Sequence, residues 1–181
     1  MRVIAGQFKG RRLKAPSWEG LRPTSDKLRE TLFNVLAPRI DGATVIDGFA
    51  GTGAVGIEAM SRGAAHVTFI EQDRRAAALI ASNLALCGVE QGYTIDCGDV
   101  ACVLRRARGT VAPDLVLLDP PYDIDTDTLM EVLEVAASRV AVAGLVVLER
   151  ASRRECGVPR SLRRVRDLKS GDSALTLMCP V

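Results

Sequence analysis

The stretch ATVIDGFAGTG, residues 43–53, decides the fold of this 181-residue chain. It reads as a short apolar strand that reaches Asp47 and enters a glycine-rich turn, after which a helical pattern runs from Gly53 to Arg62. A strand, a glycine turn and a helix in this order form the first unit of many nucleoside-binding parallel sheets. The stretch therefore predicts an α/β fold whose ligand site lies at the carboxyl end of the first strand.

Strand and helix patterns alternate through the rest of the chain. Their expected ranges are 43–47, 66–71, 93–97, 114–119 and 144–149 for strands, and 74–86, 100–108 and 126–139 for helices. A helix from a cap at Ser25 to Leu36 precedes them, and a hairpin around Gly171 follows them. The run 114–119, DLVLLD, has a continuous apolar centre, which is typical of a strand covered on both faces. We therefore predict a doubly wound, mostly parallel, Rossmann-like sheet with a C-terminal antiparallel hairpin.

The charge of the chain is divided unevenly, although its formal total is only +2. Residues 1–40 hold nine Lys and Arg against three Asp and Glu, residues 150–181 hold eight against three, and the part between them is acidic. Basic ends of this kind favour a polyanionic partner, although solvated surface charge also explains them. We predict two units, a basic substrate-binding extension over 1–40 and a catalytic domain over 41–181.

The first residues, Arg2 to Lys14, alternate and contain two glycines, which predicts a small N-terminal β-hairpin. Its cations Lys9, Arg11 and Arg12, together with Lys14, are candidate phosphate contacts. Because neighbouring side chains of a strand point to opposite faces, Lys9 and Arg11 would share one face, and Arg12 and Lys14 the other. One face would then lie along a nucleic-acid backbone while the other packs on the catalytic domain.

Composition argues against several classes of protein. No apolar run reaches the roughly 18 residues that span a bilayer, and the N-terminus has no apolar stretch suited to a signal peptide, so we expect a cytoplasmic protein with no membrane partner. The five cysteines include no CxxC pair and the chain has one histidine, so we expect reduced thiols and no metal. We also expect a monomer.

The glycine turn GTGAVG, residues 51–56, matches G-x-G-x-x-G, and Glu71 stands twenty residues after its first glycine, at the end of the next strand. This spacing fits a dinucleotide enzyme, but Asp47 beside the turn would repel a pyrophosphate. S-adenosylmethionine has no phosphate and carries an ammonium and a sulfonium group, both of which favour a nearby carboxylate. Asp99 follows the third strand at the same edge and is a candidate acceptor for the adenine amino group, or a helix N-cap, or both. The turn therefore favours a methyltransferase over a dinucleotide enzyme.

The tetrad Asp119-Pro120-Pro121-Tyr122 follows the fourth strand at the same edge of the sheet. An exocyclic amine of a base is a poor nucleophile because its lone pair is delocalised into the ring. The Asp119 carboxylate and the Pro120 carbonyl would accept hydrogen bonds from that amine, and Tyr122 would stack on a base that has left its helix. Two prolines also make a rigid turn without any such role. The position of the tetrad beside the glycine turn favours methylation of a base amine in nucleic acid.

These motifs and the sequence around them resemble the RsmD-type 16S ribosomal RNA (guanine-N2)-methyltransferases. The similar blocks are RVIAGQFKGRRLKAP (2–16), LRPTSDKLRETLFNVLAP (21–38), DGFAGTGAVGIEAMSRGAAHVTFIEQD (47–73), LLDPPYD (117–123) and GDSALTL (171–177). The resemblance implies methyl transfer from S-adenosylmethionine to the N2 amine of one guanine, guanine 966, in 16S rRNA. It also implies that the partner is an assembled or assembling small ribosomal subunit. One departure is Gly48, where the family commonly has a larger residue, and looser packing is expected there.

The resemblance also assigns roles by matching position. The predicted cofactor contacts are Asp47, Phe49, Gly51, Gly53, Glu71, Gln72, Asp99 and Val100. The guanine amine would be held by Asp119, Pro120 and Tyr122, the predicted catalytic residues. Arg22 and Thr24 would lie near the site and join the N-terminal cations in binding substrate.

Two other functions stay open from the residues alone. One is a DNA amino methyltransferase acting on adenine N6 or cytosine N4, but such enzymes usually carry a sizeable target-recognition region, and only residues 1–40 are available here. The other is a non-catalytic RNA-binding assembly protein that keeps the fold, against which the intact glycine turn and tetrad argue. Binding of the cofactor would separate an enzyme from such a protein.

Overall fold

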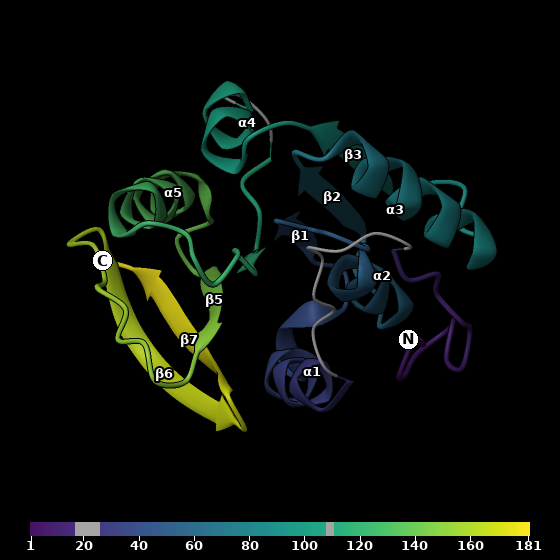
Figure 1. Ribbon diagram of the computed structural model, residues 1–181, viewed down its shortest axis with the longest axis horizontal. Helices are drawn as coiled ribbons and strands as arrows, with labels where there is room; N and C mark the ends of the chain where they lie inside the picture. The colour runs from purple at the N-terminus through teal and green to yellow at the C-terminus, as the bar shows by residue number, and fades with distance from the viewer. Residues whose placement is uncertain (17–25, 108–110) are drawn as a thin grey trace.

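Seven strands form one sheet within residues 1–16, 26–107 and 111–181, which are the residues that the computed structural model describes (Figure 1). The strands are β1 (Thr44–Gly48), β2 (His66–Glu71), β3 (Tyr93–Cys97), β4 (Leu115–Leu118), β5 (Leu145–Ala151), β6 (Leu162–Ser170) and β7 (Ser173–Pro180). The helices are α1 (Asp26–Ile40), α2 (Ala54–Ser61), α3 (Arg74–Leu86), α4 (Val100–Arg106) and α5 (Thr126–Arg139). Strands and helices alternate from β1 to β5, as the sequence predicts.

The strand order is β3-β2-β1-β4-β5-β7-β6. Strands β1 to β5 are parallel, whereas β7 is antiparallel to both β5 and β6. The chain builds from β1 outward to β3 and then returns to place β4 on the other side of β1, so the order reverses between these two strands. In an open parallel sheet, the ligand crevice lies outside the carboxyl ends of the strands at such a reversal. The predicted doubly wound sheet with a C-terminal antiparallel hairpin is confirmed.

Helices cover both faces of the sheet and divide the core into two layers (Figure 1). Strand β4 shows this division, because Leu115 and Leu117 join the layer of α1, α2 and α3, whereas Val116 and Leu118 join the layer of α4 and α5. All four side chains are buried, as expected for a strand covered on both faces. The next residue, Asp119, is the first polar one after the strand, and it comes where the strand reaches the crevice.

The N-terminal hairpin is present, but neither of its arms forms a strand. One isolated antiparallel bridge joins Arg2 to Arg12, and the chain between them turns through Gly6 and Gly10, both at positive φ. The cations of this segment are all exposed, namely Lys9, Arg11, Arg12 and Lys14. The predicted division of these cations between two faces is therefore wrong, because side chains in a turn do not alternate as they do in a strand.

Helix α1 continues past its predicted end at Leu36 to Ile40. Pro38 lies inside the helix and has no N–H to donate to the carbonyl of Asn34. Both residues are exposed, so water can bond to that carbonyl, while Ile40 is 4% exposed and packs into the core. Burial of Ile40 therefore favours a last turn that the proline by itself argues against. The predicted cap, Ser25, lies outside the described residues.

The helices of the described ranges are those of a three-layered α/β protein, and the longest of them, α1, has 15 residues. None of them is both long and apolar enough to cross a membrane. All five cysteines are free thiols.

Candidate active site

Two carboxylates of the crevice, Asp47 and Glu71, are buried and hydrogen-bonded to the backbone. Asp47, in β1, is 2% exposed, and its Oδ2 accepts the N–H of Gly56 at 2.8 Å. Glu71 ends β2, and its two oxygens accept the N–H groups of Gly51 and Asp73, each at 2.8 Å. These bonds fix the glycine turn against two neighbouring strand ends. Because each carboxylate oxygen has two lone pairs, both acids keep acceptor capacity for a ligand.

The electrostatics of Asp47 suit a cationic ligand. Burial raises the pKa of Asp47 from its ordinary value of 3.8 to about 8. The hydrogen bond from Gly56 opposes this change, while the negative charges of Asp119 and Glu71 raise the pKa further. A cation beside Asp47 would favour its ionised form and gain a charge interaction, whereas a phosphate would raise the pKa of Asp47 further and gain none. The two carboxyl groups therefore fit the ammonium and sulfonium groups of S-adenosylmethionine better than a pyrophosphate.

The turn between β1 and α2 has an unusual backbone. Gly51 and Gly53 have φ of 55° and 75°, in the left-handed region that side chains disfavour. Phe49 also has a positive φ, of 60°, although it is a bulky residue, and such strain is typical of functional turns. Its ring packs against the core layer of α4 and α5, which holds the strained conformation in place. The turn is thereby fixed in a shape that lets a ligand approach its backbone.

The other predicted cofactor residues differ in what they can offer a ligand. Asp99 is exposed and caps α4, since its Oδ1 accepts the N–H of Cys102 at 2.8 Å. Gln72 is exposed directly after β2. Val100 is 3% exposed and its side chain fills the core, so its backbone is the part that can meet a ligand.

Gly48, at the end of β1, is tightly packed. A Cβ at this position would lie 2.8 Å from Leu118 Cδ2 and 3.4 Å from Val100 Cγ1. The expectation of looser packing here is therefore wrong, because the side chain of Leu118 on the neighbouring strand fills the space.

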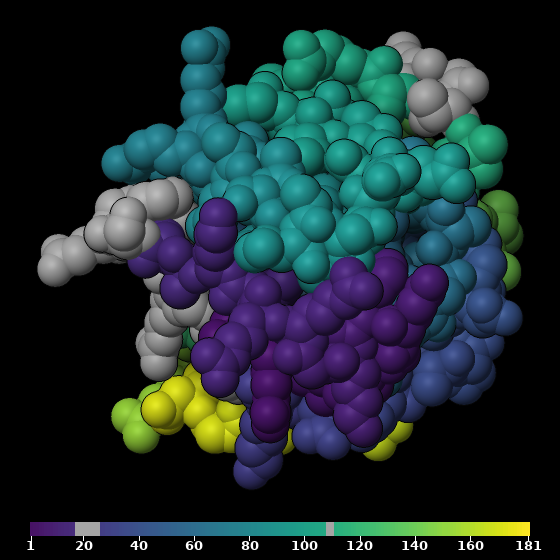
Figure 2. Space-filling model, turned by 90° about the vertical axis from the view of Figure 1, so that its right-hand side faces the viewer, coloured from purple at the N-terminus to yellow at the C-terminus, as the bar shows by residue number. Residues whose placement is uncertain are grey.

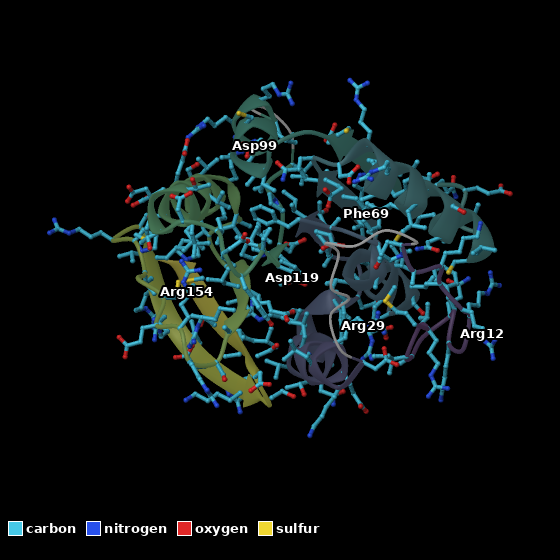
Figure 3. All side chains as sticks on the ribbon, viewed as in Figure 1. Arg12, Arg29, Phe69, Asp99, Asp119 and Arg154 are labelled. Carbon is cyan, nitrogen blue, oxygen red and sulfur yellow. The ribbon has the colours of Figure 1, made fainter. Side chains whose placement is uncertain are left out.

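The tetrad Asp119–Tyr122 lies beside the glycine turn because β4 pairs with β1. The N–H of Asp119 donates to the carbonyl of Gly48 at 3.3 Å. Figure 3 shows Asp119 in the middle of the molecule, between the helices of the two layers. Pro120 is buried, whereas Pro121 and Tyr122 are exposed. The structure thus brings Asp119 and the start of the glycine turn to the same edge of the sheet.

A small pocket lies next to the tetrad. Pro120, Pro121 and Tyr122 line it together with residues 149–151 and 154–156 of the C-terminal part. The Tyr122 hydroxyl lies 2.8 Å from the hydroxyl of Ser173, which begins β7. Apolar and charged side chains both line the pocket.

The N-terminal segment, residues 1–16, is held on α2 by buried polar side chains. Glu58 is fully buried, and its carboxylate accepts the N–H groups of Ile4 and Ala5 at 2.7 and 3.0 Å. The hydroxyl of Ser61 accepts the N–H of Phe8 at 2.9 Å. The segment is therefore part of the folded body, and Figure 2 shows it in purple lying across one face of the molecule.

Asn83 of α3 links the same segment to the glycine turn. Its Oδ1 accepts the N–H of Lys14 at 2.8 Å, and its Nδ2 donates to the carbonyls of Lys14 and Thr52 at 3.2 and 2.9 Å. Asn83 is fully buried, so these bonds are shielded from water. The end of the N-terminal segment is therefore fixed relative to the glycine turn.

The predicted substrate contacts that the structure describes do not gather at the tetrad. Lys9, Arg11 and Arg12 are exposed on the N-terminal segment, and Figure 3 shows Arg12 at the edge of the molecule, away from Asp119. Arg22 and Thr24 lie outside the described residues. The cations can therefore contact a substrate only if it extends well beyond the reacting base.

A family model described as "Conserved hypothetical protein 95" matches residues 1–179. The chain belongs to this family. A relative from Escherichia coli K12 named "Ribosomal RNA small subunit methyltransferase D" is 43% identical over 127 residues, which cover 67% of this chain. The match spans 60% of the length of that relative. A relative from Bacillus subtilis named "Putative rRNA methyltransferase YlbH" is 40% identical over 123 residues, covering 67% of each chain.

Similar solved structures match nearly the whole chain. The "Putative methyltransferase yhhF" from Escherichia coli superposes with a TM-score of 0.84 at 35% identity, covering 99% of this chain and 97% of that one. A hypothetical protein from Thermus thermophilus gives a TM-score of 0.83 at 30% identity, covering 100% and 99%. The resemblance to the RsmD-type family that the sequence motifs indicate is therefore confirmed.

Several residues that shape the site were not predicted from the sequence. They are Glu58 and Asn83, which hold the N-terminal segment, and Arg154 and Ser173, which contact the tetrad. Glu58 gives a recognisable signal, because it is the one acid in the otherwise apolar helix AVGIEAMS. Arg154 gives none, since it stands among other arginines and its partners are far away in the sequence.

Proposed function

We propose that this chain transfers a methyl group from S-adenosylmethionine to the N2 exocyclic amine of a guanine in 16S rRNA of the small ribosomal subunit, guanine 966 by resemblance. The observation that carries the proposal is the contact between Asp119 N–H and the Gly48 carbonyl, which joins the tetrad to the glycine turn. The names of the relatives support rRNA as the substrate class. We further propose that the protein acts as a cytoplasmic monomer without a metal.

The cofactor would be held by the acids and glycines at the ends of β1 and β2. Asp47 would face its cationic groups, and Glu71 would accept hydrogen bonds from the ribose hydroxyls with lone pairs that the backbone leaves available. Asp99 would accept from the adenine amino group while it caps α4. When bound, S-adenosylmethionine supplies an electrophilic methyl group, so no strong general base is required.

The guanine amine would be held on the tetrad. The Asp119 carboxylate and the Pro120 carbonyl would accept its two N–H groups, which directs the nitrogen lone pair toward the cofactor side of the crevice. The ring of Tyr122, 40% exposed, would stack on the base, a contact worth roughly 1–3 kcal/mol per base. The chain would thereby align a base that has left its stack.

Substrate RNA would be held outside the pocket by the exposed cations Lys9, Arg11 and Arg12. Arg22 and Thr24 are proposed to contact it nearer to the base. A surface of this kind binds phosphates without reading sequence, so its affinity falls steeply as salt rises. The choice of one guanine would then depend on the shape of the RNA around it.

One experiment tests the proposal against its rivals. Purified protein is incubated with radiolabelled S-adenosylmethionine and, separately, with small subunits, free rRNA and duplex DNA, and the modified base is mapped. We expect label on a single guanine of 16S rRNA. Label on DNA adenine or cytosine would instead identify a DNA amino methyltransferase. RNA binding without cofactor binding would identify a non-catalytic assembly protein.

A further inference from the structure

Arg154, in the connection between β5 and β6, reaches across to the residues that follow the tetrad. Its Nη1 donates to the carbonyl of Tyr122 and its Nη2 to the carbonyl of Ile124, both at 2.7 Å. Figure 3 shows Arg154 beside β5 and β6, on the opposite side of Asp119 from Arg12. The planar guanidinium thus joins two carbonyls of one turn to a segment about thirty residues further along the chain.

The arginine is itself anchored to the C-terminal hairpin. Arg150 donates from Nη1 to the carbonyl of Arg154 at 2.7 Å and from Nε to the hydroxyl of Thr176 at 2.9 Å. Its other terminal nitrogen lies 3.4 Å from a carboxylate oxygen of Asp167. A chain of hydrogen bonds therefore runs from β6 and β7, through Arg150 and Arg154, to the backbone of the turn.

The same hairpin also contacts the side chain of Tyr122. The hydroxyl of Ser173 lies 2.8 Å from the tyrosine hydroxyl. Arg154 therefore holds the backbone carbonyl of Tyr122, and Ser173 holds the hydroxyl at the end of its side chain. Tyr122, Pro120 and Arg154 line the same pocket. The position of one wall of this pocket thus depends on the C-terminal part of the chain.

We infer that Arg154 is a positioning residue, which holds the Tyr122 ring where it must lie for a base to stack in the pocket. The inference rests on the proposed function, because stacking requires a nucleobase substrate. It gives the antiparallel hairpin, which extends the sheet through the pairing of β7 with β5, a second role beside the tetrad. Arg154 does not touch the reacting atoms and acts through the backbone of Tyr122.

The test compares three variants with the wild type. Arg154→Ala removes both hydrogen bonds, Arg154→Lys cannot span two carbonyls with one planar fork, and Arg153→Ala changes an exposed neighbour as the matched control. We expect Arg154→Ala to lower kcat on the RNA substrate roughly 10- to 100-fold, because small misplacements of reacting groups cost about that much. Arg154→Lys should fall between it and the wild type, and Arg153→Ala should match the wild type.

Two further readouts separate positioning from general damage. Cofactor affinity, measured by calorimetry, should change less than about twofold in every variant, since the glycine turn is untouched. Amide hydrogen exchange in residues 119–128 should be faster in Arg154→Ala than in Arg153→Ala, while exchange in β1 and β2 stays the same. If Arg154→Ala does not fold, the same measurements are made on Arg154→Lys and compared with Arg153→Ala.

The outcomes are distinct. Wild-type kcat in Arg154→Ala, or unchanged exchange in 119–128, would overturn the positioning role. The exchange experiment needs no RNA, so it decides whether Arg154 fixes the turn even if the substrate is another one. A wild-type protein that methylates no RNA would overturn the proposed function, and the base-stacking role with it.

Discussion

The two halves of the proposed site, one for the cofactor and one for the target base, are held in place in different ways. On the cofactor side, Asp47 and Glu71 are buried and bind backbone N–H groups only nine and twenty residues away. On the target side, Tyr122 is exposed, and it is held by Arg154 and Ser173, which lie 32 and 51 residues further on. The cofactor half is therefore organised within its own strand-turn-helix units, whereas the target half depends on the C-terminal hairpin. Mutations in one half should accordingly change cofactor affinity, and mutations in the other should change methyl transfer.

The sharpest test of this separation is Asp119→Ala. We expect methyl transfer to fall roughly 10²- to 10³-fold, because the variant loses an acceptor aimed at the reacting amine. Cofactor affinity should stay nearly unchanged, since Asp119 is assigned to the target half. Single-turnover rates with saturating cofactor, together with calorimetry, measure both quantities. Near-wild-type turnover on rRNA or small subunits would refute the mechanism. A large loss of cofactor affinity would show that the two halves of the site are not independent.

The converse change is Glu71→Ala, on the cofactor side. Loss of hydrogen bonds to a charged acceptor should weaken cofactor binding by roughly 1.5–3 kcal/mol. The structure adds a second cause, because Glu71 also fixes the N–H groups of Gly51 and Asp73. Glu71→Gln, which keeps one acceptor oxygen, should lose less. Calorimetry of both variants checks the order, and wild-type affinity in both would remove Glu71 from the cofactor site.

The pH dependence of stability tests the burial of Asp47. Because its pKa in the folded protein is about 8, well above the ordinary 3.8, the folded state binds more protons than the unfolded state between these values. The free energy of unfolding should therefore fall as pH rises from about 4 to 8. Asp47→Asn, which can still accept from Gly56, should remove this contribution, which amounts to about 3–4 kcal/mol between pH 5 and pH 8. Urea unfolding at pH 5 and pH 8 measures it, and parallel curves for both proteins would show that Asp47 is ionised throughout.

The smallest expected effect concerns the exposed cations of the N-terminal segment. Deleting residues 1–14 would remove Val3 and Leu13 from the core and leave Glu58 without its backbone partners, so reversal of Arg11 and Arg12 to Glu is the cleaner change. Loss of two phosphate contacts should lower the slope of log affinity against log salt by about 1.4. Substrate affinity measured at several salt concentrations gives the slope. Curves that superimpose with the wild type would leave these arginines without a role in RNA binding.

The sequence predicts best those features that depend on residues close together in the chain. The ranges of β2, α3 and α5 were predicted to the residue, because apolar periodicity and helix caps act within a few positions. The end of α1 was missed, since burial of Ile40 against a distant layer outweighs the local effect of Pro38. Packing at Gly48 was also missed, because the side chain that fills its space belongs to another strand.

The sequence by itself determined the parallel sheet, the order of its strands and helices along the chain, and the meeting of the glycine turn with Asp119. These depend on patterns that repeat every two or four residues and on the rule that parallel strands end at one edge. The tertiary structure alone decided that Glu58 and Asn83 hold the N-terminal segment, and that Arg154 and Ser173 hold Tyr122. Such contacts join residues far apart in the chain through single hydrogen bonds, which leave no periodic pattern in the sequence.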